Sequence, residues 1–144
     1  MHEIKTEIEI NATPERVWSI LMDFSSYPEW NPFIRRIEGA GEVGERLSVF
    51  IHPPGGQGME FRPVVLGVIP NRELRWRGRV LLPGVLDGEH YFQLTQAGAN
   101  RTRFVQGEFF SGLLAWLLKG KLDVGTKAGF EAMNQALRAR AETS

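Results

Sequence analysis

The chain has 144 residues, with 17 basic side chains balanced by 17 acidic ones, and it contains no cysteine. A neutral chain without a basic block has no electrostatic footprint for nucleic acid or anionic lipid. The lack of cysteine excludes disulfides and thiolate chemistry. With 42% apolar residues, the composition predicts one globular domain over residues 1–144.

The N-terminal part predicts a strand followed by a helix. Residues 3–11 alternate apolar and charged side chains, which is typical of a half-buried strand. Thr13 is the expected N-cap of the helix, with Pro14 at its first position. The helix should end before Pro28, because the residue preceding a proline is disfavoured in the helical region.

Six further strands are predicted near residues 34–39, 45–52, 59–69, 73–81, 88–96 and 101–110. Strands joined by turns, without helices between them, indicate an antiparallel meander. The tail from about 112 to 141 is predicted to be helical. A curved sheet with one apolar face needs a cover, and a single helix cannot fill it, so we expect a cavity between the two.

Side-chain alternation predicts which residues face inward. In strand 73–81, Arg75, Arg77 and Arg79 should face water while Trp76 faces in. In the last two strands the even-numbered residues are assigned to the inner face: His90, Phe92, Leu94, Phe104, Gln106, Glu108 and Phe110. The facing of strand 59–69 stays open, because both of its faces are apolar, and a bulge near Pro63 would reconcile them.

His90 and Glu108 are the candidate catalytic residues. If a turn at 97–101 joins the last two strands, His90 lies opposite either Glu108 or Gln106. His90 is interpreted either as a histidine satisfied inside the sheet or lining the pocket, or as a general base. Glu108 is likewise either a carboxylate at the pocket mouth or outer face, or an acid–base group. His2, His52 and His90 show no ligand spacing, so we predict no metal and no cofactor.

The apolar run LLAWLL at 113–118 is too short to span a membrane, so it is predicted to be a lid or a buried helix start. The N-terminus is not a signal peptide, which makes the cytoplasm the expected location. Phe130 and Met133 form a helical stripe that would be both core and cavity floor. The segment YPEWNPF at 27–33 is either an aromatic cavity mouth or a hydrophobic plug.

Several segments resemble the START-related (SRPBCC) superfamily of polyketide cyclases/dehydrases and lipid-transport proteins. The most specific are PERVW with YPEWNPF, LRWRG, and FEAMNQALRARAE. The resemblance covers essentially the whole chain. It implies an α+β helix-grip fold, with a seven-stranded antiparallel sheet wrapped around a long C-terminal helix and two short helices after the first strand. It also implies a cavity for hydrophobic small molecules.

Carried onto this sequence, the resemblance makes YPEWNPF the second short helix and the cavity entrance. The ligand-binding residues are then Trp30, Phe33, Trp76, His90, Phe92, Gln106, Glu108, Phe110, Phe130, Met133 and Asn134. The resemblance transfers no mechanism, because the enzymes of the family use pocket residues that differ between subgroups.

Three functions are weighed. We favour non-catalytic binding of a small hydrophobic or aromatic ligand, such as a lipid or polyketide. The alternative is a cyclase or dehydratase in which His90 and Glu108 act as acid–base groups while Trp76 and Trp30 position the substrate. The third is an interaction module that binds a partner through the outer sheet face, where Arg75 and Arg77 lie. The expected partner is a small molecule, with neither nucleic acid nor stable membrane insertion, in a monomer or homodimer.

Overall fold

The structure is a computed structural model that describes residues 2–80, 84–117 and 119–143. Its elements, in chain order, are β1 (His2–Ile10), α1 (Pro14–Met22), the 3-10 turn η1 (Phe24–Ser26), α2 (Tyr27–Trp30), β2 (Ile34–Glu38), β3 (Ser48–Ile51), β4 (Met59–Phe61), β5 (Val64–Ile69), β6 (Glu73–Val80), β7 (Leu86–Gly98), β8 (Arg101–Ser111), α3 (Leu113–Leu117) and α4 (Lys119–Glu142). The end of predicted strand 73–81 and residue 118 of LLAWLL lie outside the described residues.

The helix α1, which follows β1, begins where the sequence predicts. The Thr13 side chain accepts a hydrogen bond from the Arg16 main-chain nitrogen, and Pro14 occupies the first turn of α1. α1 ends at Met22, before Pro28. Pro28 lies in the first turn of α2, where no helical partner is lost, so the two predicted short helices are confirmed.

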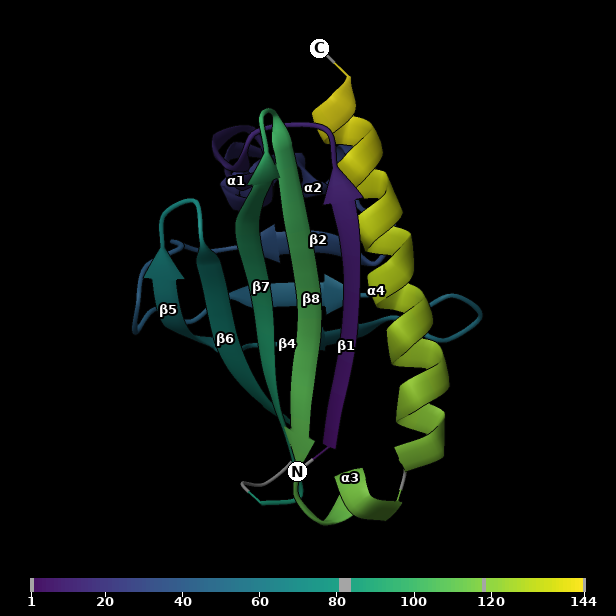
Figure 1. Ribbon diagram of the computed structural model, residues 1–144. Coiled ribbons are helices and arrows are strands. Elements are labelled where there is room, and N and C mark those ends of the chain that lie inside the picture. The colour runs from purple at the N-terminus through teal and green to yellow at the C-terminus, as the bar shows by residue number, and fades with distance from the viewer. Residues whose placement is uncertain (1, 81–83, 118, 144) are drawn as a thin grey trace.

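The strands form two antiparallel sheets. The large sheet has the order β1-β8-β7-β6-β5, and the small sheet has the order β2-β3-β4. Figure 1 shows the small sheet running across the large one, with α4 alongside β1. The inner face of the large sheet carries the buried side chains of Trp76, Phe92 and Phe104, so the predicted facing of these strands is confirmed.

The strand predicted at 59–69 is two strands that belong to different sheets. β4 ends at Phe61 and β5 begins at Val64, so the described residues hold eight strands where seven were predicted. Pro63 cannot donate to a ladder, and the chain changes sheets at this position. The ambiguous facing has the same origin, since β4 and β5 each have their own inner side. The α+β helix-grip fold stands.

The C-terminal segment predicted to be helical comprises α3 and α4. Gly120 lies inside α4. Phe130, Met133 and Leu137 are fully buried, which confirms the predicted apolar stripe. In α3 only Ala115 is buried, and Trp116 is 77% exposed, so this segment is not a buried helix start. None of the helices in the described ranges is both long and apolar enough to cross a membrane.

Candidate functional site

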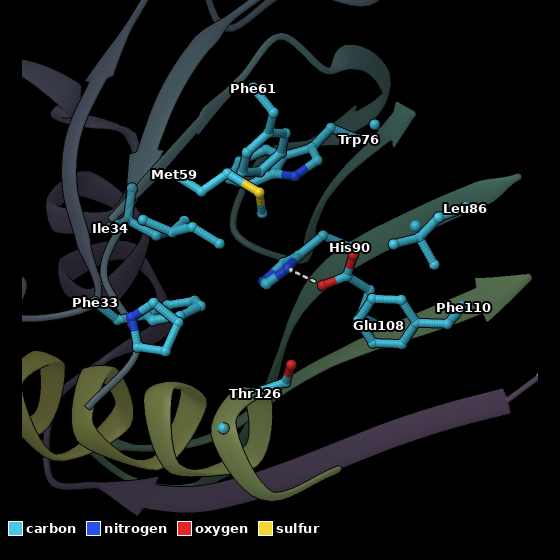
Figure 2. Close-up of a pocket in the computed structure, with 15 residues that line it drawn as sticks. Phe33, Ile34, Met59, Phe61, Trp76, Leu86, His90, Glu108, Phe110 and Thr126 are labelled. Carbon is cyan, nitrogen blue, oxygen red and sulfur yellow. Dashed lines mark hydrogen bonds and ion pairs between the residues drawn. The ribbon is translucent and has the colours of Figure 1, made fainter. Parts of the chain in front are cut away.

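A cavity of about 290 Å³ lies between the two sheets and α4. Figure 2 shows the side chains that surround it. Its lining residues are Phe33, Ile34, Ile51, Pro53, Met59, Phe61, Trp76, Gly78, Leu86, Gly88, His90, Glu108, Phe110, Gly125 and Thr126. The wall is therefore apolar apart from His90, Glu108 and Thr126. Met59 lines the cavity and is 44% exposed, so the wall reaches the protein surface at β4.

Two glycines shape the wall on the large sheet. Gly78 of β6 and Gly88 of β7 are paired across the strands and both line the cavity. A Cβ at Gly78 would lie 3.0 Å from the Phe61 ring, and one at Gly88 would collide with Glu108 Oε2. The glycines thus leave room for the side chains of Phe61 and Glu108, as strand glycines often do where another group approaches closely.

The His90 ring lies in an aromatic cage. It stacks on Trp76 with ring centroids 5.2 Å apart, and it contacts Phe92 at 4.6 Å and the edge of Phe130 at 4.9 Å. The residue is only 4% exposed. Figure 2 shows the ring projecting from β7 toward the middle of the cavity wall. Packing on several sides leaves the imidazole little rotational freedom.

His90 contacts both of the partners that the sequence left open. The register places it directly opposite Glu108, and Nδ1 lies 3.2 Å from Glu108 Oε1. Its other nitrogen, Nε2, lies 2.9 Å from Gln106 Oε1. Glu108 and Gln106 are two residues apart on one face of β8, so a single ring can bridge them.

The hydrogen bonds continue from Gln106 into the core. Gln106 Nε2 donates to Asn134 Oδ1 at 2.8 Å and lies 3.5 Å from the Phe130 carbonyl. Asn134 Nδ2 donates to Thr6 Oγ1 at 2.8 Å, and the Thr6 hydroxyl donates to the Gln106 carbonyl at 2.9 Å. All the polar atoms of this buried chain are satisfied, which removes the cost of placing them in the core.

All the predicted binding residues except Trp30 fall into two groups. Phe33, Trp76, His90, Glu108 and Phe110 line the cavity. A second set forms the buried layer behind or beside the wall: Phe92, Gln106, Phe130, Met133 and Asn134. Their predicted contact with a ligand would thus be indirect, through the rings and hydrogen bonds just described.

The segment YPEWNPF contributes a single residue to the lining. Phe33 is 3% exposed and packs edge-on against Phe130 at 5.7 Å. Tyr27 is fully buried and donates to the Leu21 carbonyl; burial, reinforced by the charge of Asp23, raises the pKa of Tyr27. Trp30 packs on Tyr27 and borders a separate, polar hollow on the α1 side. The segment mainly plugs one end of the sheet.

Sequence reasoning missed most of the opposite wall. Ile34, Ile51, Met59 and Phe61 come from the small sheet, and Thr126 comes from α4. No signal in the sequence reveals how the small sheet crosses the large one. The glycines did carry a signal, since Gly88 shares the even-numbered face of His90 and marks a close approach.

Within the described residues, no three His, Asp or Glu side chains gather as a metal ion would require. His90 and Glu108 contact each other, and the lining adds no third such ligand. What the arrangement can do is hold a proton between an imidazole and a carboxyl group at the edge of an apolar space.

Residues 1–142 match the family described as polyketide cyclase / dehydrase and lipid transport. Since the match spans almost the whole chain, the chain belongs to this family, as the sequence motifs predicted. Membership supports a role in ligand binding or cyclisation in general. No curated protein matches the chain.

Solved structures share the fold. A START superfamily protein from Mycobacterium smegmatis is 20% identical, covering 99% of this chain and 98% of its own, with a TM-score of 0.79. An aromatase/cyclase from a Streptomyces species is 17% identical over 98% of this chain and 93% of its own, also at 0.79. A Helicobacter pylori protein is 18% identical over 98% of this chain and 88% of its own, with a TM-score of 0.80. At these identities the likeness shows the fold alone.

Proposed function

We propose that the chain binds a small apolar or aromatic molecule in the cavity between its sheets and α4. The observation that carries this proposal is the lining itself, which is apolar except for a few convergent polar groups, the usual make-up of a small-molecule site. The volume of about 290 Å³ is at the small end of such sites and favours a compact ligand.

The test is saturable binding of a neutral fluorescent probe, N-phenyl-1-naphthylamine, to the purified protein. Thr126 lines the cavity, so Thr126→Phe should fill it and weaken binding by about tenfold or more. The matched control is Lys127→Phe, which adds the same ring at the exposed neighbouring position of α4 and should leave affinity within about twofold. Equal affinity in both variants would place the probe elsewhere and overturn the proposal.

A second candidate function is that of a cyclase or dehydratase. It is favoured by the His90–Glu108 pair, because loss of water from a hydroxy ketone needs a base for the carbon-bound proton and an acid for the departing hydroxyl. Native mass spectrometry first identifies a retained ligand. Turnover of that ligand by the protein, abolished in His90→Ala with binding retained, would favour the enzyme; unchanged ligand would count against it.

The third candidate function, an interaction module that binds a partner through the outer sheet face, has less support than the other two. Arg75 forms ion pairs with Glu73 and Glu89 and lies over the Tyr91 ring. Its charge is therefore already engaged within the sheet, where a partner would have to displace these contacts. Loss of partner capture in Arg75→Glu and Arg77→Glu would be the observation in favour of such a role.

A further inference from the structure

The polar chain behind His90 has a fixed direction, set by two main-chain carbonyls. Thr6 has a single hydroxyl proton, which it donates to the Gln106 carbonyl, so its oxygen must accept from Asn134 Nδ2. Asn134 therefore turns its Oδ1 toward Gln106, and Gln106 must donate through Nε2. The Phe130 carbonyl, 3.5 Å from the same nitrogen, favours the same amide orientation.

This direction determines the tautomer of His90. Since Gln106 turns Nε2 toward Asn134, it turns Oε1, which can only accept, toward the imidazole. His90 Nε2 must then carry a proton. The remaining nitrogen, Nδ1, lies 3.2 Å from Glu108 Oε1, and a hydrogen bond between these two atoms requires a proton on one of them.

The other carboxyl oxygen of Glu108, Oε2, is not engaged by His90, and the Glu108 side chain lines the cavity. Oε2 lies beside Gly88, which lines the wall, and no donor among the described residues reaches it. With the proton held between Nδ1 and Oε1, Oε2 has only lone pairs to offer in either protonation arrangement. Glu108 therefore presents an acceptor to whatever occupies the cavity.

A molecule bound in the cavity needs a hydrogen-bond donor next to Glu108 Oε2. A hydroxyl or N–H group would satisfy Oε2, whereas a bare hydrocarbon would leave it unpaired once water is displaced. A carboxylate would place lone pairs against lone pairs. The described lining residues include no lysine or arginine to compensate for that repulsion.

We propose that Thr6, Asn134 and Gln106 are positioning residues that hold His90 with Nε2 protonated, so that Glu108 selects apolar ligands carrying a hydrogen-bond donor and rejects carboxylates. The ligand preference rests on the proposed binding function, while the tautomer does not. The ligand class is thus a neutral phenol, alcohol or amine, as distinct from a fatty acid.

Nitrogen-15 NMR of the imidazole tests the positioning part without any ligand. The chain has three histidines, and His90→Gln assigns the signal of interest. We expect the His90 Nε2 nitrogen to be protonated in the unmodified protein. A spectrum with Nδ1 protonated and Nε2 bare would overturn the proposal by itself.

A matched pair of variants then tests the role of the chain. Thr6→Val removes the anchoring hydroxyl, which frees both amides to turn over, so a fraction of His90 should shift to the opposite tautomer. Thr102→Val is the control. Thr102, on β8, is buried like Thr6, but its hydroxyl donates to the Ala12 carbonyl and takes no part in the hydrogen bonds that lead to His90. Spectra that are the same in both variants would show that the chain does not set the tautomer.

Calorimetric titration with naphthalene, 2-naphthol and 2-naphthoate tests the ligand preference. We expect 2-naphthol to bind about tenfold more tightly than naphthalene, and 2-naphthoate to bind weakest. In Glu108→Leu the advantage of 2-naphthol over naphthalene should vanish. Equal binding of all three would overturn the preference while the binding function stands. If none of the three binds, the preference fails, the titration with N-phenyl-1-naphthylamine decides the proposed function, and the NMR spectrum still decides the tautomer.

Discussion

Phe33 depends on a glycine opposite it. Its ring lies against Gly129 of α4, where an added Cβ would collide with the ring. Gly120 lies in the same helix with nothing near its missing side chain. The two glycines thus differ in what they do, although both sit inside a helix and both cost helix propensity.

Gly129→Ala should therefore lower the free energy of unfolding by about 1–3 kcal/mol and shift Phe33 into the cavity, weakening N-phenyl-1-naphthylamine binding. Gly120→Ala is the control, and it should stabilise the protein by about 0.5–1 kcal/mol because it removes flexibility from the unfolded chain. Urea unfolding and probe titration measure both effects. A stabilised Gly129→Ala protein would contradict the role given to this contact.

Glu73 is a second residue whose environment makes a prediction. Partial burial alone would raise the pKa of Glu73, but hydrogen bonds from Arg75 and Gln93 and the Arg75 charge outweigh it and hold the pKa below its usual 4.5. A carboxyl group whose pKa is lower in the folded state stabilises the protein above its unfolded pKa. That contribution fades as the pH falls through the lowered value.

Glu73→Gln should thus cost about 1 kcal/mol at neutral pH, and the difference from the unmodified protein should shrink as the pH drops below 4.5. Urea unfolding over a pH series measures the difference. Glu9→Gln, at an exposed carboxylate on β1, is the control and should show little change. A cost that is constant with pH would contradict the assignment.

At the scale of elements, local signals predicted the start of α1 and the facing of β6, β7 and β8. These depend on residues close in sequence: a cap at Thr13 and strict alternation around Trp76. Pro28 did not set the end of α1, because α1 already ends at Met22 and Tyr27, just before the proline, is itself helical. The split at Pro63 was not predictable in the same way, because which sheet a strand joins depends on partners far along the chain. The Ile51 and Phe61 side of the cavity was missed for that reason.

The N-cap of α1 offers an element-scale prediction. Thr13→Ala removes the 3.2 Å hydrogen bond to the Arg16 nitrogen and should cost about 1 kcal/mol of unfolding free energy. Thr13→Ser keeps the hydroxyl and should retain most of the stability. Thermal or urea unfolding measures both variants, and equal losses in the two would mean that the cap bond contributes nothing.

At the scale of the whole molecule, a ligand that binds only the folded state must stabilise it. At a free concentration of about 100 times Kd the gain is about 2.7 kcal/mol. For a chain of this size that should raise the melting temperature by about 5–10 °C. Calorimetry with 2-naphthol measures the shift, and Thr126→Phe should show a smaller one at the same concentration. Equal shifts in both proteins would argue against occupation of the cavity.

The cavity wall is divided between two sheets that meet along a short line, where main-chain hydrogen bonds join residues 44–47 to residues 63–65. The hydrogen-bonded chain lies wholly in β1, β7, β8 and α4, whereas the bulky opposite wall belongs to the small sheet. The bulky wall can therefore be changed by mutation without altering the residues that form the hydrogen bonds. A library randomised at Ile51, Met59 and Phe61 would vary the size of the accepted molecule while its polar end stays the same.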